Sequence, residues 1–570
     1  MKLVQHSDAP ENMSDPSGGG RLSPTVADAV GRRLAALGVD TFFGVVGSGN
    51  FVVTAALSGA GARFVAARHE SGAVCMADGW ARVTGRVGVC SLHQGPGLTN
   101  AVTGIAEAVK SRTPLLVLAG DTPPAALASN FLIDQDGLVT SVGAIAETIY
   151  SAETAEADAV RALRRARLER RPVILNLPID VQAQPAAGVP DVAAAPLPGA
   201  PGPRPADVAA AADLLEQAQR PLIIAGRGAV ISDAGPALAA LGERCGALLA
   251  NSAPAHGIFA GEPFGLGIAG GFSTPLAAGL LPQADVVISF GAGLNHWTTR
   301  HGELIGAQAR LIGVDVDPGA IGKNRRADLA VAADASAMAE ALDAELARRG
   351  VSPAPWRTEE LRDELAARRW RDEPFEPSDA GGVIDPRTLS IALADLLPAD
   401  KAVVIDSGHF TGWPAMFLDV EDPRAWLFVN GFQCVGLGLG CAIGAAVAAP
   451  ERMTVLAVGD GGLFLSLPEL DTAARVGARL LVVVYDDAAY GAELHHFGPM
   501  GHDTDTVRFR DADLAAIAAA AGCGAVTVRS LDDLAPVEAW ARDGGGPLLV
   551  DAKVDPAIVA DWLKDAFRAG

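Results

Sequence analysis

The sequence predicts an α/β protein of three doubly wound parallel-sheet domains. Apolar, largely β-branched runs alternate with helix-like stretches along the chain, which is typical of βαβ units. Hydrophobic residues make up 49% of the sequence and glycine occupies 65 positions, as suits parallel sheets that are buried on both faces. At 570 residues, the chain is long enough for about three or four domains.

The first domain is expected at residues 22–183, after a polar and disordered N-terminus at residues 1–21. Its last strand is predicted at residues 172–178, where an apolar run lies between prolines. The stretch 183–205 is rich in alanine and proline, which is typical of a linker.

The second domain is expected at residues 206–350, with strands predicted at 221–225, 285–290 and 309–315. A charged helical region and a polar linker follow it. The third domain is expected at residues 383–570.

Two aspartates of the third domain, Asp460 and Asp487, each follow an apolar run, and a helix-like stretch separates these runs. The arrangement is that of a βαβ unit. Both carboxylates are therefore expected at the carboxyl ends of parallel strands, where open α/β sheets bind ligands.

Glycines surround the first of these aspartates. Gly459, Gly461 and Gly462 allow backbone amides to approach an anion closely, and a helix expected to begin near Leu463 points its N-terminus at that anion. Two hard oxygen ligands beside such a pocket indicate Mg²⁺ bound to a diphosphate.

The spacing of the aspartates, 487 − 460 = 27 positions, resembles the GDG…NN cofactor signature of thiamine diphosphate (ThDP) enzymes. In that family the GDG aspartate, the second residue of the NN pair and a carbonyl two positions later bind the metal. The resemblance implies that Asp460, Asp487 and the carbonyl of Ala489 hold Mg²⁺. The Asn-Asn pair is replaced by Asp486 and Asp487, which adds a negative charge beside the diphosphate. Strand-end aspartates that only cap helices are the structural alternative.

A second segment, at residues 68–85, resembles the RHE…GYAR.TG stretch of the pyrimidine domain of ThDP enzymes, especially of the acetolactate synthase-like branch. Glu70 falls on the glutamate that hydrogen-bonds N1′ of the cofactor's aminopyrimidine ring. A carboxyl group that is partly shielded from water can share a proton with N1′ near neutral pH, because desolvation raises the pKa of the carboxyl group. Residues 85–100 also follow the family's strand, GPG turn and helix.

Further cofactor contacts are implied by two stretches of the third domain. Residues 432–440 resemble the GTMG-like stretch whose bulky apolar residue holds the cofactor bent, which places Val435 at that position and Gln433 beside it. Valine is smaller than the family's methionine, leucine or isoleucine, and a place in the core is the alternative. Residues 405–413 resemble the segment that contacts the diphosphate, with His409 as the expected contact.

Substrate-handling residues are predicted in two places. The segment from Tyr490 to Glu493 is similar to the GYTIE segment of pyruvate decarboxylases, which implies a cofactor contact for Tyr490 and a protonation role for Glu493. An exposed helix glutamate is the alternative. His93 and Gln94, before the turn at residues 95–97, are predicted to face the reacting carbon. His495 and His496 either line the same pocket or face solvent.

Several positions differ from acetolactate synthase itself. The arginine that meets FAD and the acceptor in those enzymes falls on Gly293, the catalytic glutamine on Ile133 and a lysine on Ala146. These differences argue against FAD and against a 2-oxo acid as second substrate.

The resemblance extends over nearly the whole chain and implies an enzyme that uses ThDP and Mg²⁺ to decarboxylate a 2-oxo acid such as pyruvate. Ligation of the product to an aldehyde or ketone acceptor is the first expectation. Release of an aldehyde, by a decarboxylase or hydroxyketone lyase, is the alternative, and an inactive ThDP-fold binding protein is the third. The donor, the acceptor and the pathway stay open. Because the family's site is assembled between two chains, a homodimer or homotetramer is expected.

Composition restricts the partners and the compartment. The net charge of −22 disfavours nucleic acid and anionic membranes. We expect neither a signal peptide nor a membrane span, because the apolar runs are too short. The six cysteines show no CxxC or metal-ligand spacing and are expected to be reduced, which favours a cytoplasmic enzyme.

Overall fold

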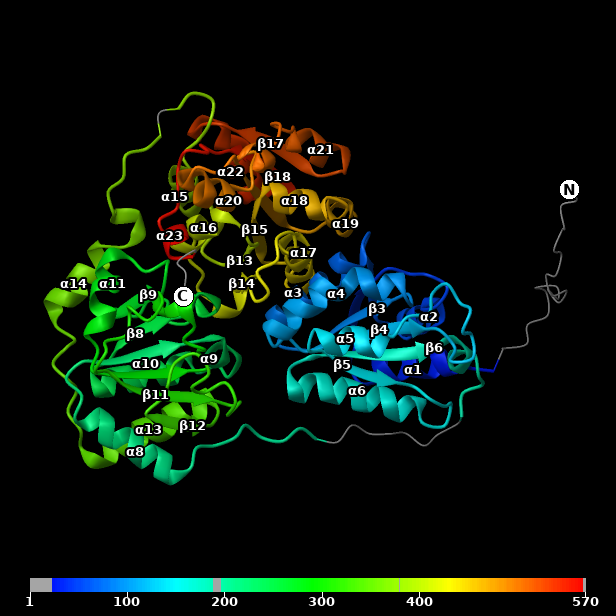
Figure 1. Ribbon diagram of the computed structural model, residues 1–570, viewed down its shortest axis with the longest axis horizontal. Coiled ribbons are helices and arrows are strands. Elements are labelled where there is room, and N and C mark those ends of the chain that lie inside the picture. Colours follow the sequence, from blue (N-terminus) through cyan, green and yellow to red (C-terminus); the bar gives the residue numbers. More distant parts are fainter. Residues whose placement is uncertain (1–22, 188–195, 379, 567–570) are drawn as a thin grey trace, which may run out of the picture.

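The computed structural model describes residues 23–187, 196–378 and 380–566. The described chain forms three six-stranded sheets, each covered by helices, and the three bodies lie side by side in Figure 1. Residues 1–21, which were expected to be disordered, lie outside the described residues, as does part of the linker predicted at residues 183–205.

The N-terminal sheet has the strand order β2-β1-β3-β4-β6-β5, and all its neighbouring strands are parallel. Its strands are β1 (Thr41–Gly44), β2 (Arg63–Ala66), β3 (Gly88–Leu92), β4 (Leu115–Asp121), β5 (Ile145–Thr148) and β6 (Pro172–Pro178). Its helices are α1 (Val26–Ala36), α2 (Phe51–Gly59), α3 (Glu70–Thr84), α4 (Pro96–Lys110), α5 (Gln135–Ser141), α6 (Ala155–Glu169) and α7 (Ile179–Gln182).

The central sheet has the order β12-β11-β10-β7-β8-β9 and is also parallel. Its strands are β7 (Pro221–Ala225), β8 (Leu248–Asn251), β9 (Gly265–Ile268), β10 (Val286–Phe290), β11 (Arg310–Asp315) and β12 (Leu329–Ala332). Its helices are α8 (Pro205–Glu216), α9 (Arg227–Ile231), α10 (Gly235–Cys245), α11 (Pro275–Leu280), α12 (His296–Thr299) and α13 (Ala335–Arg349), and α14 (Glu359–Ala367) follows them.

The C-terminal sheet has the order β14-β13-β15-β16-β18-β17 and is parallel throughout. Its strands are β13 (Lys401–Ile405), β14 (Trp426–Phe428), β15 (Met453–Gly459), β16 (Leu480–Asp486), β17 (Gly524–Val528) and β18 (Leu548–Lys553). Its helices are α15 (Pro386–Leu396), α16 (Gly412–Phe417), α17 (Gly438–Ala448), α18 (Asp460–Ser466), α19 (Glu469–Val476), α20 (Gly491–Phe497), α21 (Leu514–Ala520), α22 (Ala535–Asp543) and α23 (Trp562–Ala566).

The predicted fold class is confirmed, because three parallel sheets with flanking helices are present. The predicted strands at residues 172–178 and 221–225 are found at those bounds as β6 and β7. In the C-terminal sheet the order reverses between β13 and β15, and ligands bind beyond the carboxyl ends of strands at such a reversal. The end of β15 carries Asp460.

The N-terminal and C-terminal domains pack together through α3 and α17, which lie beside each other in Figure 1 and contribute to one apolar cluster. Small residues make this close packing possible. A Cβ added at Gly79 of α3 would collide with the backbone of Cys441, and one added at Gly444 of α17 would collide with the backbone of Met76. The backbones of α3 and α17 are therefore in direct contact at these glycines, and the relative position of the two helices tolerates little change.

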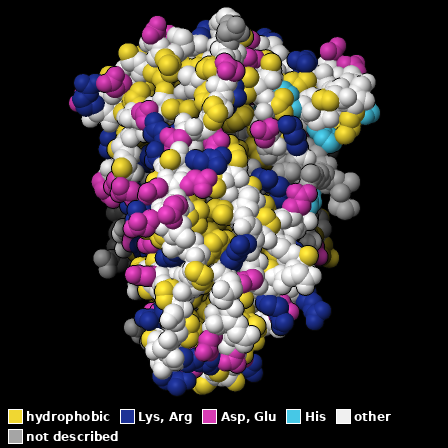
Figure 2. Space-filling view, turned by 90° about the vertical axis from the view of Figure 1, so that its left-hand side faces the viewer, with side chains coloured by type: hydrophobic (Ala, Val, Ile, Leu, Met, Phe, Trp, Pro, Cys, Tyr) yellow, Lys and Arg dark blue, Asp and Glu magenta, His cyan; other side chains and the backbone are white. Residues whose placement is uncertain are grey.

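On the face shown in Figure 2, acidic and basic side chains lie intermixed with apolar ones. Among the described residues, no helix combines the length and the apolarity needed to cross a bilayer. All six cysteines are free thiols, and five of them are buried.

Candidate functional site

Asp460 begins helix α18 at the carboxyl end of β15. The helix was expected to begin near Leu463, and that expectation is wrong by about one turn. Gly459 is the N-cap residue, with extended backbone angles (φ −83°, ψ 162°). Asp460 therefore lies in the first turn, where the partial positive charge of the helix N-terminus stabilises a carboxylate. Its exposed fraction is 6%.

The carboxyl groups of Asp460 and Asp487 both have pKa values well above the ordinary value of an aspartate. Burial, together with the charges of Asp487 and Asp486, raises the pKa of Asp460 to about 8. Burial raises the pKa of Asp487 to about 7. Two neighbouring carboxyls, one buried and one half-buried, cannot both ionise easily unless a cation joins them. The pair therefore has the electrostatics of a site that accepts a divalent cation.

The additional carboxylate at Asp486 is neutralised by a lysine. Asp486 and Lys553 are paired in register on the neighbouring strands β16 and β18, and Lys553 Nζ donates to Asp486 Oδ2 at 2.5 Å. Lys553 also contacts Asp511 at 2.6 Å and Asp551 at 3.1 Å. Burial disfavours its charge, but these carboxylates outweigh burial and raise its pKa. The departure from Asn-Asn is thus compensated within the chain.

The turn after β16 brings Asp487 toward the other predicted ligands. Ala489 N donates to Asp487 Oδ1 at 3.2 Å, and Ala488 adopts a left-handed backbone (φ 53°). A Cβ added at Gly491 would lie 2.5 Å from Asp487 Oδ2 and 3.2 Å from His409 Cβ. The absence of a side chain at Gly491 therefore allows the turn that carries Asp487 to lie against His409.

The glycines after β15 form a tight cradle. A Cβ at Gly461 would lie 2.8 Å from the Tyr490 ring. One at Gly462 would lie 2.6 Å from Asp406 Oδ2 and 3.3 Å from Val435 Cγ1. Val435 thus lies against the glycine turn at residues 459–462, where the resemblance places the bulky apolar residue that holds the cofactor bent.

Asp406, which sequence reasoning did not assign, is fully buried at the end of β13. Its carboxylate accepts hydrogen bonds from Gly436 N at 2.8 Å and Leu437 N at 3.3 Å, although burial still raises its pKa to about 7. It anchors the turn that presents Val435. The rule that selected Asp460, an aspartate directly after an apolar strand, also selects Asp406.

His409 is held as a neutral ring with a defined tautomer. Ala560 N donates to its Nε2 at 3.1 Å, so the ring proton resides on Nδ1. Burial and the neighbouring His495 lower the pKa of His409 to about 3, and the two rings lie 4.5 Å apart. Nδ1 lies 3.2 Å from a Cβ added at Gly491, beside the turn that carries Asp487.

Glu70 lies at the first position of α3 in the N-terminal domain. Asn100 Nδ2 donates to its Oε2 at 3.0 Å, while Oε1 lies 3.6 Å from a Cβ added at Gly97. Among the described residues, the hydrogen bond from Asn100 is the one made to this carboxylate. The second oxygen is available to a ligand.

His93 and Gln94 lie in the same domain. His93 Nδ1 contacts the carbonyl of Gln94 at 2.9 Å, and because a carbonyl only accepts, Nδ1 is the donor in this contact. Nε2 lies 3.4 Å from Ser48 Oγ. The side chain of Gln94 is buried against Gly49 and Gly120, and its Oε1 has no protein partner. Their predicted role at the reacting carbon stays a prediction.

The remaining predicted residues lie at the surface of the C-terminal domain. Glu493, Gln433 and Tyr490 are exposed, and Gln433 has a left-handed backbone (φ 57°). Such strain in a residue other than glycine tends to occur at functional sites. Their roles also stay predictions.

The donor set suits Mg²⁺ and a diphosphate. Among the described residues, no group of three or more His, Cys, Asp or Glu side chains could hold a metal. Two carboxylates and one carbonyl nevertheless fit Mg²⁺, which commonly completes its shell with water and phosphate oxygens. The close-packed glycines and the Nδ1 proton of His409 suit the phosphate oxygens.

Comparison with known families agrees with this geometry. Residues 24–140 match the thiamine pyrophosphate enzyme N-terminal TPP binding domain, residues 208–342 the central domain, and residues 406–552 the C-terminal TPP binding domain.

Three relatives extend over most of the chain. A probable 2-ketoarginine decarboxylase of Pseudomonas aeruginosa is 34% identical over 526 residues, 90% of each chain. An acetolactate synthase large subunit of Parasynechococcus marenigrum is 33% identical over 466 residues, 79% of this chain and 74% of the relative. A sulfoacetaldehyde acetyltransferase of Rhodobacter capsulatus is 31% identical over 590 residues, 95% of this chain and 96% of the relative. Together with the three domain matches, these similarities show that the chain belongs to the thiamine pyrophosphate enzyme family.

Proposed function

We propose that the chain binds thiamine diphosphate with Mg²⁺, decarboxylates a 2-oxo acid and ligates the product to a carbonyl acceptor. The observation that carries this proposal is the meeting of two carboxyl groups at one glycine-lined sheet edge, Asp460 buried and Asp487 half-buried, whose raised pKa values favour a divalent cation between them. The carbonyl of Ala489 is the third ligand in this proposal.

The residues of the chain divide the work. When bound, the cofactor supplies a thiazolium that accepts the electrons released as the carboxyl group leaves. The neutral His409 would hold a phosphate oxygen through a hydrogen bond from Nδ1–H, and Val435 would support the bent cofactor. Glu70 holds a proton at N1′ through Oε1, the oxygen that Asn100 leaves free.

The proposed enzyme is at least a homodimer. In this proposal one chain supplies Glu70 and a second chain supplies the metal-binding half of each site, as the family resemblance implies. Exposed apolar side chains on both halves support this arrangement. They are Phe131, Leu132 and Ile133 of the N-terminal domain, at 36–42% exposure, and Phe464 and Leu465 of α18, at 45% and 66%. Patches of this kind mark contact surfaces.

Release of an aldehyde without ligation is the second candidate. The relative named as a probable 2-ketoarginine decarboxylase favours it, as does the similarity of the sequence around Glu493 to pyruvate decarboxylases. An inactive binding protein is the third candidate. It was suggested by the Asp486–Asp487 pair, and the ion pair between Asp486 and Lys553 weakens that argument.

The discriminating experiment is product analysis by mass spectrometry. The protein is incubated with ThDP, Mg²⁺ and either pyruvate or 2-ketoarginine, with and without an acceptor aldehyde. A new hydroxyketone that appears only with the acceptor supports the carboligase. Aldehyde alone in every mixture supports the decarboxylase. Absence of ThDP binding under saturating Mg²⁺ supports the inactive protein.

A further inference from the structure

Glu469, at the first position of α19, is a buried carboxylate that no step of the proposed reaction uses. Its exposed fraction is 1%. It accepts hydrogen bonds from His69 N at 2.9 Å and from Arg68 N at 3.1 Å, both through Oε1. Thr472 Oγ1 donates to Oε2 at 2.7 Å. The carboxylate thus reaches from the C-terminal domain to the two amides that immediately precede Glu70.

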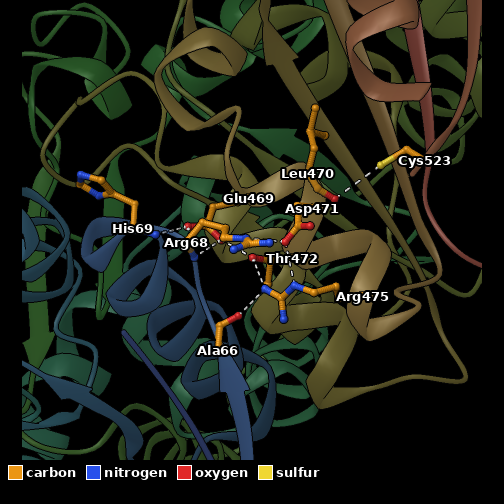
Figure 3. A network of polar contacts seen from close by, with 9 residues as sticks. All are labelled: Ala66, Arg68, His69, Glu469, Leu470, Asp471, Thr472, Arg475 and Cys523. Atoms are coloured by element: carbon orange, nitrogen blue, oxygen red, sulfur yellow. Dashed lines mark hydrogen bonds and ion pairs between the residues drawn. The ribbon is translucent and has the colours of Figure 1, made fainter. Parts of the chain in front are cut away.

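A second set of contacts ties the same connection to α19 (Figure 3). Arg68 Nε donates to Asp471 Oδ2 at 2.6 Å, and Arg475 Nε donates to the same oxygen at 2.7 Å. Arg475 Nη2 donates to the carbonyl of Ala66, the last residue of β2, at 2.7 Å. The segment between β2 and α3 is therefore attached to α19 at its beginning, middle and end.

The Glu469 carboxylate fits against α3 because position 72 is a glycine. A Cβ added at Gly72, in the first turn of α3, would collide with the Glu469 carboxylate. The body of α3 is held at the same time by α17, because Gly440 lies against the side chain of Cys75. The Glu469 side chain thus packs against the first turn of α3, the helix that begins with Glu70.

We propose that Glu469 is a positioning residue, which sets the location of the Glu70 carboxylate by holding the backbone amides of Arg68 and His69. This inference rests on the proposed role of Glu70. The function of Glu469 is geometric: it holds one acceptor oxygen, Oε1, within hydrogen-bond distance of both amides, and its charge is not the operative property.

The geometric role separates two conservative variants. In Glu469→Gln, an amide oxygen can still accept from both backbone N–H groups, while the amide nitrogen replaces Oε2 opposite Thr472 Oγ1. In Glu469→Asp, the charge stays but the side chain is one carbon shorter and no longer reaches the amides. The positioning role predicts that Gln behaves like the wild type and that Asp is impaired, whereas a charge role predicts the reverse.

The first measurement is hydrogen–deuterium exchange of the full-length protein without cofactor. Glu469→Asp is expected to speed deuterium uptake by the peptide that contains Arg68 and His69 by about tenfold, because each amide loses its hydrogen bond to Oε1. Glu469→Gln and the control Glu359→Gln, at an exposed first-turn glutamate of α14, should leave the uptake unchanged. Equal uptake in Glu469→Asp and the wild type would overturn the proposal.

The second measurement is exchange of the C2 hydrogen of bound ThDP with deuterium, followed by NMR. Because a displacement of about 1 Å strongly reduces reactivity, Glu469→Asp should slow it by about tenfold or more, at unchanged ThDP affinity. A purely structural role would lower thermal stability and leave this rate intact, which would contradict positioning. Glu70→Gln separates the two claims. If it exchanges at the wild-type rate, the proposed role of Glu70 fails; if it is slow while Glu469→Asp is normal, only the positioning role fails.

Discussion

Removal of the lysine that neutralises Asp486 is the perturbation with the best-defined magnitude. The Lys553, Asp486 and Asp551 side chains are 7%, 3% and 0% exposed. Lys553→Met leaves Asp486 and Asp551 buried without their cation, and breaking a buried ion pair by removing one partner costs about 3–5 kcal/mol. For a domain of this size, 1 kcal/mol shifts the melting temperature by about 2–4 °C. The transition of the C-terminal domain should therefore fall by roughly 6–20 °C.

Differential scanning calorimetry with two further variants tests the cause. Asp486→Asn leaves Lys553 its contacts with Asp511 and Asp551 at 2.6 and 3.1 Å, so a loss of only about 1 kcal/mol is expected. The double variant Asp486→Asn, Lys553→Met removes both charges and should recover much of the loss. A melting temperature for Lys553→Met within about 2 °C of the wild type, a shift worth under about 1 kcal/mol, would refute the reasoning, as would a double variant that is no better than Lys553→Met.

The other predictions concern the cofactor. Glu70→Gln should bind ThDP with nearly wild-type affinity and lose most activity, which calorimetric titration and CO2 release measure on the same sample; full activity would exclude the assigned role. Mg²⁺-dependent ThDP binding should weaken by about two orders of magnitude between pH 8 and pH 6. The reason is that the pKa values of Asp460 and Asp487 are raised to about 8 and 7, so the metal must displace their protons. Titrations at several pH values that show no change in affinity would contradict this. Since these pKa values lie above those of the unfolded chain, the cofactor-free protein should also lose stability as pH rises through the same range, a trend that calorimetry checks. Gly491→Ala should weaken Mg²⁺-dependent binding, because the added Cβ lies 2.5 Å from Asp487 Oδ2, whereas Gly59→Ala, with nothing within 4 Å, is the matched control; equal Mg²⁺ half-saturation in both variants would be evidence against the placement of Asp487.

Local patterns were sufficient to predict the parallel sheets and the placement of Asp460 and Asp487 at one sheet edge. The run before Asp460 and the run before Asp487 are neighbouring strands, β15 and β16, and both carboxylates lie at one sheet edge as the βαβ pattern required. The helix start was misplaced because glycines lower helix propensity. That rule does not take into account that Gly459 can serve as an N-cap.

Contacts between distant residues could not be predicted in this way. Lys553 is 67 residues from Asp486, and only the register of β16 with β18 brings them together. Glu469 is 400 residues from His69, and its role depends on how two domains pack. The tautomer of His409 depends on Ala560, 151 residues away. A single sequence specifies such pairs only through the complete fold.

The central claim is that the Asp460 and Asp487 site uses ThDP and Mg²⁺ to decarboxylate a 2-oxo acid. Its most direct test is CO2 release from a panel of 2-oxo acids that includes pyruvate and 2-ketoarginine, in protein shown by calorimetry to have bound ThDP. The account predicts release from at least one donor that requires both ThDP and Mg²⁺ and disappears in Asp460→Asn. ThDP-loaded protein that releases no CO2 from any donor, or release that persists in Asp460→Asn, would contradict it.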